Sequence, residues 1–121
     1  MANTITVNTL LSAVTNGGLA SVQRQLSAQF AMAGNLVSSG IVNIATSDTQ
    51  FPIASLGGGT IGMLLIHNTD PTNYMTLGAD GSHYPILINP NGWCLTAWNG
   101  AAVHGIANTA GVNAEYYILQ A

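Results

Sequence analysis

Apolar and polar residues alternate along much of the chain, and this period of two indicates β-strands that bury one face. Near the N-terminus, Ile5 and Val7 alternate with Thr and Asn residues. Residues 20–30 alternate as well, with Ser or Gln at each odd position and an apolar residue at each even position except Arg24. A Thr-Asn-Gly-Gly turn signal at residues 15–18 separates the two runs. The pattern therefore predicts two strands joined as a hairpin.

A helix is the alternative for residues 19–33. Helical spacings of three and four connect the apolar residues Leu19, Val22, Leu26 and Phe30. The Gln, Ala, Leu and Arg residues of this run are also good helix formers. We favour the strand, because the alternation continues throughout the run and the turn signal supplies a hairpin partner.

After Gly34 and Asn35, short apolar segments are separated by turn signals. The expected strands cover residues 42–44, 51–56, 61–67, 74–77, 84–88, 93–98, 101–107 and 112–119. Residues 61–67 form the most apolar segment, which predicts a buried central strand, with residues 74–77 as its return strand. Hairpin-type dipeptides lie at Asp80-Gly81, Asn91-Gly92 and Asn99-Gly100.

This spacing predicts an all-β fold, either an antiparallel β-sandwich or a jelly-roll-like barrel. We expect an N-terminal arm or hairpin, residues 1–35, followed by a compact β domain, residues 36–121. A domain of this size can bury a sizeable core.

Charged residues make up only 4% of the chain, against about 25% in typical soluble domains. Arg24 is the only Lys or Arg, so the chain cannot bind nucleic acid through phosphates or a membrane through a basic patch. No segment has the roughly 20 apolar residues of a membrane span. Because interface cores are poor in Lys, Glu and Asp, we expect a surface covered by protein neighbours, including copies of this chain.

The four acids fall near turns or strand ends, with three aspartates in loops and Glu115 starting the last strand. The outward faces are therefore expected to consist of Thr, Ser, Asn and Gln. Arg24 lies on the apolar side of its run, where a buried guanidinium needs a carboxylate or carbonyl partner. Glu115, another acid, or an acid of a neighbouring subunit would serve. The alternative is an edge position with the charged head in water.

Aromatic residues are the other candidates for an interface. Trp93 and Trp98 are five residues apart and face opposite sides of a regular strand, as do the neighbours Tyr116 and Tyr117. An exposed aromatic side chain anchors a partner subunit or stacks on a sugar. The candidate interface residues are Arg24, Phe30, Trp93, Trp98, Tyr116 and Tyr117.

Two motifs suggest binding sites that the context does not support. Residues 57–62 match G-x-G-x-x-G, but a strand follows where a dinucleotide site needs a helix, so no cofactor is expected. The credible metal ligands are His67, Asp70, His83 and His104. Their spacing fits no zinc signature. We therefore expect ordinary roles in turns and at strand ends, and no metal.

Catalysis has little support either. Asp80, Ser82 and His83 supply the residue types of a catalytic triad, but neighbours on a strand point to opposite faces. Asp70 and Asp80 could approach each other across a hairpin as paired carboxylates, although turn chemistry is the simpler role. No catalytic residue is assigned, and the chain is not expected to be an enzyme.

The C-terminal half carries a succession of turn motifs. An apolar strand leads into Asn-Thr-Asp-Pro-Thr-Asn at residues 68–73, a strand ending at Gly78 follows, then a Pro-Asn-Gly turn at residues 90–92 and an aromatic-aliphatic strand at residues 115–119. Over residues 60–121 this succession resembles small virion structural proteins of tailed bacteriophages, although those have Gly directly after the proline.

The resemblance implies a non-enzymatic component of a phage virion, made in the host cytoplasm. We expect a capsid decoration (cement) protein that binds the assembled head in many copies. Its partners would be the major capsid protein or other virion proteins, and copies of itself. The alternatives are a tail, baseplate or head-tail joining protein, and a carbohydrate-binding β-sandwich module that uses Trp93 or Trp98.

Overall fold

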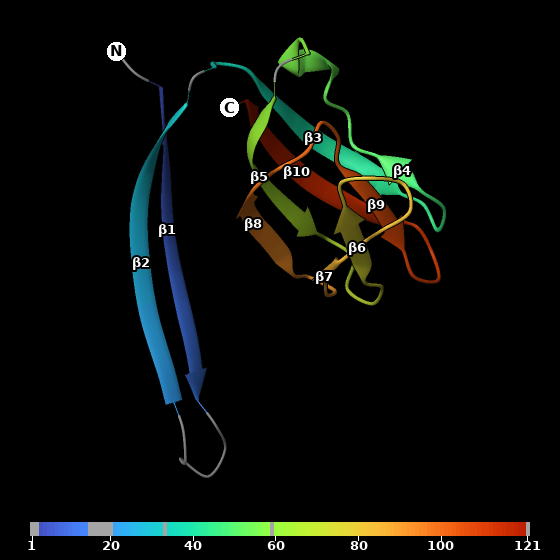
Figure 1. Ribbon diagram of the computed structural model, residues 1–121. Helices are drawn as coiled ribbons and strands as arrows, with labels where there is room; N and C mark the ends of the chain where they lie inside the picture. The colour runs from blue at the N-terminus through green and yellow to red at the C-terminus, as the bar shows by residue number, and fades with distance from the viewer. Residues whose placement is uncertain (1–2, 15–20, 33, 59, 121) are drawn as a thin grey trace. The chain divides into compact units, whose positions relative to one another are not determined.

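The computed structural model describes residues 3–14, 21–32, 34–58 and 60–120, and it confirms the all-β fold (Figure 1). The chain forms two compact units, Met1–Ala33 and Gly34–Ala121. The boundary lies at residues 33/34, where the sequence suggested 35/36. Among the described residues the only helical element is a 3-10 helix, η1 (Ala54–Leu56). No helix in this part of the chain is long and apolar enough to cross a membrane.

The first unit is an antiparallel hairpin of β1 (Asn3–Val14) and β2 (Ser21–Met32), which we call the arm. The strand favoured for the second run is therefore confirmed over the helix. The turn expected at residues 15–18 lies outside the described residues. Polar side chains at most alternate positions, with Leu10 as an exception on β1, give each strand one polar face, which suits a sheet better than a helix.

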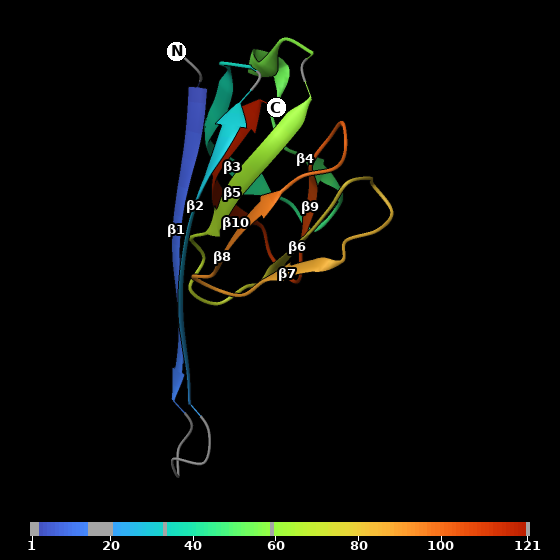
Figure 2. The ribbon, with the colours of Figure 1, turned by 60° about the vertical axis from the view of Figure 1, so that its left-hand side comes forward.

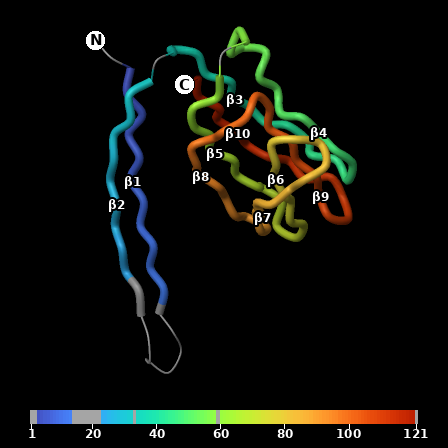
Figure 3. The backbone as a smooth tube through the Cα atoms, in the orientation of Figure 1, coloured from blue at the N-terminus to red at the C-terminus, as the bar shows by residue number. Residues whose placement is uncertain are grey.

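The described residues of the second unit form eight strands in two four-stranded sheets, ordered β3-β10-β5-β8 and β4-β9-β6-β7 (Figures 1 and 2). The strands are β3 (Val37–Ile44), β4 (Thr49–Gln50), β5 (Ile61–Asn68), β6 (Met75–Gly78), β7 (Ile86–Ile88), β8 (Trp93–Ala97), β9 (His104–Ala107) and β10 (Val112–Gln120). The chain changes sheet at every connection except β6–β7, as the backbone path in Figure 3 shows. Eight strands in two sheets linked in this way form a jelly roll.

The core lies between the two sheets. Phe51 and Tyr116 meet edge to face there, with ring centroids 5.7 Å apart and an interplanar angle of 79°. β5 is an interior strand of its sheet, which confirms the expected buried central strand. The residues of this core are Ile44, Phe51, Leu56, Ile61, Leu64, Ile66, Met75, Leu77, Ile88, Val103, Ala107, Val112, Ala114, Tyr116 and Ile118.

The strand expected at residues 51–56 is wrong. β4 ends at Gln50, and η1 occupies Ala54–Leu56. Pro52 has no backbone N–H for a sheet ladder, so the segment leaves the sheet directly after the buried Phe51.

Several expected connections are wrong as well. β6 is not the return strand of β5, because the two belong to different sheets. Asn91-Gly92 and Asn99-Gly100 also connect strands of different sheets, whereas Asp80-Gly81 does lie within the β6–β7 hairpin. A turn dipeptide indicates that the chain reverses direction. In a jelly roll most of these reversals connect strands of different sheets.

Candidate protein–protein interface

The outward-facing side of the β3-β10-β5-β8 sheet is set by the alternation in β10. Val112, Ala114, Tyr116 and Ile118 are buried in the core. Their neighbours along the strand therefore point away from the core, because successive side chains of a strand face opposite sides. Glu115 and Tyr117 stand at the centre of this outward side.

Two rows of side chains cross the sheet at these positions. Glu115 lies between Ile41 of β3 and His67 of β5. His67 in turn lies opposite Trp93 of β8. Directly opposite residues of antiparallel strands share a face, so these four side chains form one row.

Tyr117 is the centre of the second row. It lies between Ser39 of β3 and Leu65 of β5, and Leu65 lies opposite Leu95 of β8. We call the two rows together the outer face, which consists of Ser39, Ile41, Leu65, His67, Trp93, Leu95, Glu115 and Tyr117.

The outer face is largely apolar and open to solvent. Ile41 is 69% exposed, Trp93 60% and Tyr117 42%. Contiguous exposed apolar surface of this kind marks sites of interaction with another molecule. The expectation that outward sheet faces consist of hydroxyl and amide side chains is therefore wrong for this sheet. The sequence does indicate this apolar outward face through the adjacent apolar residues at 41–42, 64–65 and 116–117, because such a pair places an apolar group on both faces of a strand.

Glu115 brings a carboxylate onto this apolar surface. It lies inside β10, which begins at Val112, so its expected place at the start of the strand is wrong. Its Oε1 is 4.0 Å from His67 Nδ1, and the two side chains are 42% and 39% exposed. The outer face therefore presents a single acid beside a histidine.

The arm also has one apolar face. In register, Ile5 lies opposite Phe30, and Leu11 lies opposite Arg24. The apolar face of the arm consists of Ile5, Val7, Thr9, Leu11, Arg24, Leu26, Ala28 and Phe30. Leu11 is 63% exposed and Phe30 45%. A two-stranded hairpin has no second layer with which to cover such a face, and isolated hairpins are marginally stable in water.

The six candidate interface residues divide by exposure. Arg24, Phe30, Trp93 and Tyr117 are exposed. Tyr116 is in the core, and Trp98 packs against the core while its Nε1 donates a hydrogen bond to the Ala102 carbonyl at 3.0 Å. The opposite facing expected for each aromatic pair is confirmed. Arg24 lies on the apolar side of the arm, as expected, with its side chain in solvent.

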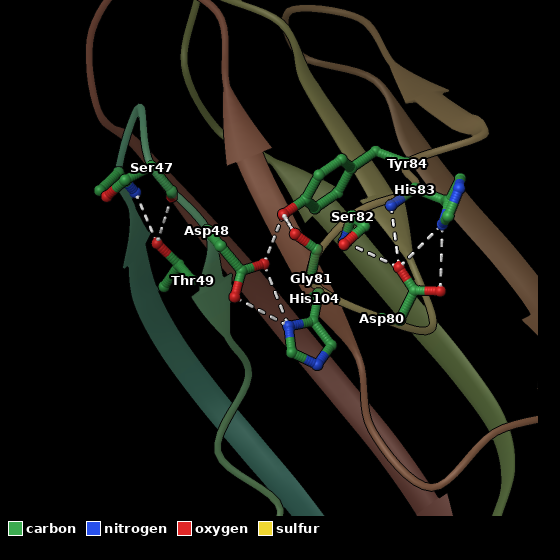
Figure 4. Close-up of polar contacts among 10 residues, drawn as sticks. Ser47, Asp48, Thr49, Asp80, Gly81, Ser82, His83, Tyr84 and His104 are labelled. Atoms are coloured by element: carbon green, nitrogen blue, oxygen red, sulfur yellow. Dashed lines mark hydrogen bonds and ion pairs between the residues drawn. The ribbon is translucent and has the colours of Figure 1, made fainter.

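A second polar group lies at one end of the β4-β9-β6-β7 sheet (Figure 4). Asp48 Oδ1 accepts a hydrogen bond from the Tyr84 hydroxyl at 2.6 Å, and both Asp48 oxygens lie 3.0 Å from His104 Nδ1. The hydrogen bond from Tyr84, with a contribution from His104, lowers the pKa of Asp48. The same Asp48 contact raises the pKa of Tyr84 to about 12. The cluster joins the β3–β4 loop, the β6–β7 loop and β9.

The residues of the suspected triad form a turn. Asp80 Oδ1 accepts hydrogen bonds from the backbone N–H groups of Ser82 and His83, each at 2.8 Å, and lies 3.2 Å from His83 Nδ1 (Figure 4). These contacts lower the pKa of Asp80. Ser82 and His83 lie in the β6–β7 loop and not on a strand, so the turn, rather than opposite strand faces, decides how these residues lie. The Asp80 carboxylate is already used to close that loop.

Asp70 plays the same part in the β5–β6 loop, where it accepts hydrogen bonds from the N–H groups of Thr72 at 2.8 Å and Asn73 at 2.7 Å. The expected turn roles of both aspartates are thus confirmed. Asp70 and Asp80 stand at opposite ends of β6, so they do not approach as paired carboxylates.

The structure does not bring the suspected metal ligands together. Each histidine has a different carboxylate as its neighbour: Glu115 for His67, Asp80 for His83 and Asp48 for His104. Within the described ranges, no group of three or more His, Cys, Asp or Glu side chains is placed to hold a metal ion. The glycine motif at residues 57–62 leads into β5, a strand, as expected.

The fold and the two exposed apolar faces define a jelly-roll domain with an amphipathic hairpin arm. Comparison with models of protein families, with curated proteins and with solved structures found no match.

Proposed function

We propose that the protein is a non-enzymatic structural component of a phage particle, a capsid decoration protein that binds the assembled head in many copies. The observation that carries the proposal is the exposed apolar outer face on a chain with 4% charged residues. A surface of this kind loses little hydration energy when protein covers it. The resemblance of residues 60–121 to small virion proteins agrees with this role.

The fold adds limited support. Double-sheet jelly rolls are an architecture of viral capsid domains and also of lectins. Fold alone does not decide function, so the argument depends on the surfaces. Decoration is multivalent, because many copies each cover a modest area of the particle, and the summed binding exceeds that of one copy.

The arm supplies a second means of attachment. β1 and β2 pair only with each other among the described strands, so each presents one backbone edge. A strand of the major capsid protein or of another virion protein can add to such an edge. Loss of the arm should then weaken attachment without unfolding the jelly roll, whose core contains no described arm residue.

The number of copies per purified particle tests the proposal. Particles from a lysate of the strain that carries the gene are purified, and the protein is counted by quantitative mass spectrometry. Hundreds of copies are expected for a head decoration protein. A few or a dozen copies would indicate a tail, baseplate or neck protein instead, and absence from the particles would refute a virion role. Deletion of residues 2–33 should lower the copy number, with circular dichroism confirming that the domain remains folded.

Carbohydrate binding is the second candidate, and the 60% exposure of Trp93 favours it. An exposed indole on a sheet face can stack on a sugar ring. Titration of the isolated protein with a glycan panel, followed by tryptophan fluorescence, separates the two functions. Saturable binding that is lost in Trp93→Ala would support the lectin function over the structural one.

A further inference from the structure

We propose that the outer face binds the arm of a second copy of this protein, with Arg24 of one copy paired with Glu115 of the other. The inference rests on the proposed function and deepens it, because it names a partner for the outer face. The arm is a compact unit of its own, and its apolar face is not part of the core. Both surfaces therefore need a cover that the core of the jelly roll does not provide.

Charge complementarity identifies the partner. Arg24 is the only Lys or Arg of the chain, and it lies on the apolar face of the arm. The other three acids, all aspartates, accept hydrogen bonds from loop residues. Glu115 is the one acid on a sheet face, and its near neighbour is His67 at 4.0 Å. The single fixed cation and the single sheet-face acid thus lie on the two apolar surfaces that lack a cover.

The ion pair would fix the position of the contact. Apolar surfaces alone tolerate many alignments, whereas a charge buried without its partner is strongly unfavourable. With Arg24 placed on Glu115, the apolar residues around them, Leu11 and Leu26 on the arm and Ile41 and Trp93 on the sheet, cover one another. An alignment that separates the two residues would bury the Arg24 guanidinium against apolar side chains without a carboxylate partner.

The arm is longer than the outer face to which it would bind. Each arm strand has 12 residues, about 40 Å, whereas β3 and β5 have 8 residues each, about 26 Å. An arm laid along the outer face therefore extends past it. Because arm and face are different surfaces, the contact either occurs twice in a symmetric dimer that exchanges arms, or runs head to tail and closes as a ring.

Charge reversal in the purified full chain tests the inference. Sedimentation velocity over a concentration series measures association of the wild type, Arg24→Glu and Glu115→Arg. We expect each single reversal to weaken association about a hundredfold, because it places like charges together in an apolar contact. The double variant R24E/E115R should regain the wild-type association. Gln25→Glu is the matched control, since Gln25 adjoins Arg24 on the opposite, polar face of the arm.

A mixture of the two single variants gives the decisive readout. The arm of R24E matches the sheet of E115R, and the arm of E115R with the sheet of R24E carries the native pair of Arg24 and Glu115. The mixture should therefore form a heterodimer in which both contacts are complementary, whereas each variant alone brings like charges together. Tryptophan emission should shift to the blue as Trp93 is covered. A mixture that stays monomeric while the double variant behaves as wild type would mean that the arm folds onto its own domain, which overturns the inference.

Two further outcomes are decisive. A wild type that is monomeric at every concentration overturns self-association, and hundreds of copies on particles would then still support the proposed function. If a reversal prevents folding, as judged by circular dichroism, Arg24→Gln and Glu115→Gln replace it. Each neutral variant is expected to weaken association about tenfold, and unchanged association would contradict the inference.

Discussion

At the scale of single residues, Asn68 shows how a buried amide fixes the loops at the end of β5. Its side chain is fully buried. Nδ2 donates to the carbonyl of Asn73 at 2.8 Å and lies 3.3 Å from that of Asn89, while Oδ1 accepts from the N–H of Asp70 at 2.9 Å. One side chain thus satisfies backbone groups of the β5–β6 and β7–β8 connections.

Asn68→Ala should therefore destabilise the jelly roll by about 1–3 kcal/mol, because it leaves buried backbone groups without partners. Chemical denaturation, followed by tryptophan fluorescence, measures the change in the free energy of unfolding. Asn89→Ala is the control, since the Asn89 side chain is exposed and only its carbonyl takes part. Equal stability of the two variants would contradict this role for Asn68.

The raised pKa of Tyr84 predicts that the protein loses stability in alkaline solution. Its hydrogen bond to Asp48 raises its pKa from 10.0 to about 12. A group whose pKa is raised on folding contributes stability below its unfolded pKa and loses that contribution as the pH rises through its folded pKa. The contribution is thus complete below pH 10 and disappears as the pH approaches 12. In Tyr84→Phe, the denaturation midpoint should fall less between pH 9 and 12 than in Tyr117→Phe, and parallel curves would refute the prediction.

At the scale of elements, the β6–β7 hairpin depends on the absence of a side chain at its first corner. Gly78 is buried, and a Cβ there would overlap the carbonyl oxygen of His83. Because that obstacle is backbone, the hairpin must open to accommodate alanine. Gly78→Ala should cost about 1–3 kcal/mol or more in unfolding free energy. Gly100→Ala is the matched control, since its Cβ would first meet side-chain atoms at 3.2 Å. A loss no larger than that of the control would contradict the argument.

The elements also show what could be predicted from the sequence. Alternation located the arm strands, whose apolar side chains share one face of the hairpin, and a continuous apolar run located β5. It failed at residues 51–56, where the buried Phe51 and Leu56 are apolar without belonging to a strand. Connections between sheets could not be derived, because a turn dipeptide specifies local backbone angles and not the sheet to which the next strand belongs.

The same limit applies to the candidate interface. Strand geometry predicted that Trp93 and Trp98 face opposite sides. It could not predict which of the two is exposed, because that depends on which side of the sheet the core lies. The row of Ile41, Glu115 and His67 arises from strand register across three segments that are distant in sequence. Pairing of this kind leaves no local pattern in the sequence.

At the scale of the whole molecule, low charge and the apolar outer face should act together on solubility. The net charge is -3 at pH 7 and the sequence pI is about 5.2, so repulsion between copies is weak and vanishes near that pH. Proteins without net charge associate and precipitate most readily. The association should proceed through the exposed apolar surface rather than through the chain at large.

Two lysine substitutions separate net charge from its location. Ile41→Lys places a cation on the outer face, whereas Ser47→Lys places it in the exposed β3–β4 loop, and both change the net charge by the same amount. Each variant is measured at the pH equal to its own isoelectric point, where it has no net charge and its copies do not repel one another. Light scattering should then be several-fold lower for Ile41→Lys, because burial of its ammonium group against a second copy is unfavourable. Equal scattering would mean that aggregation follows net charge alone and that the outer face has no special part in bringing copies together.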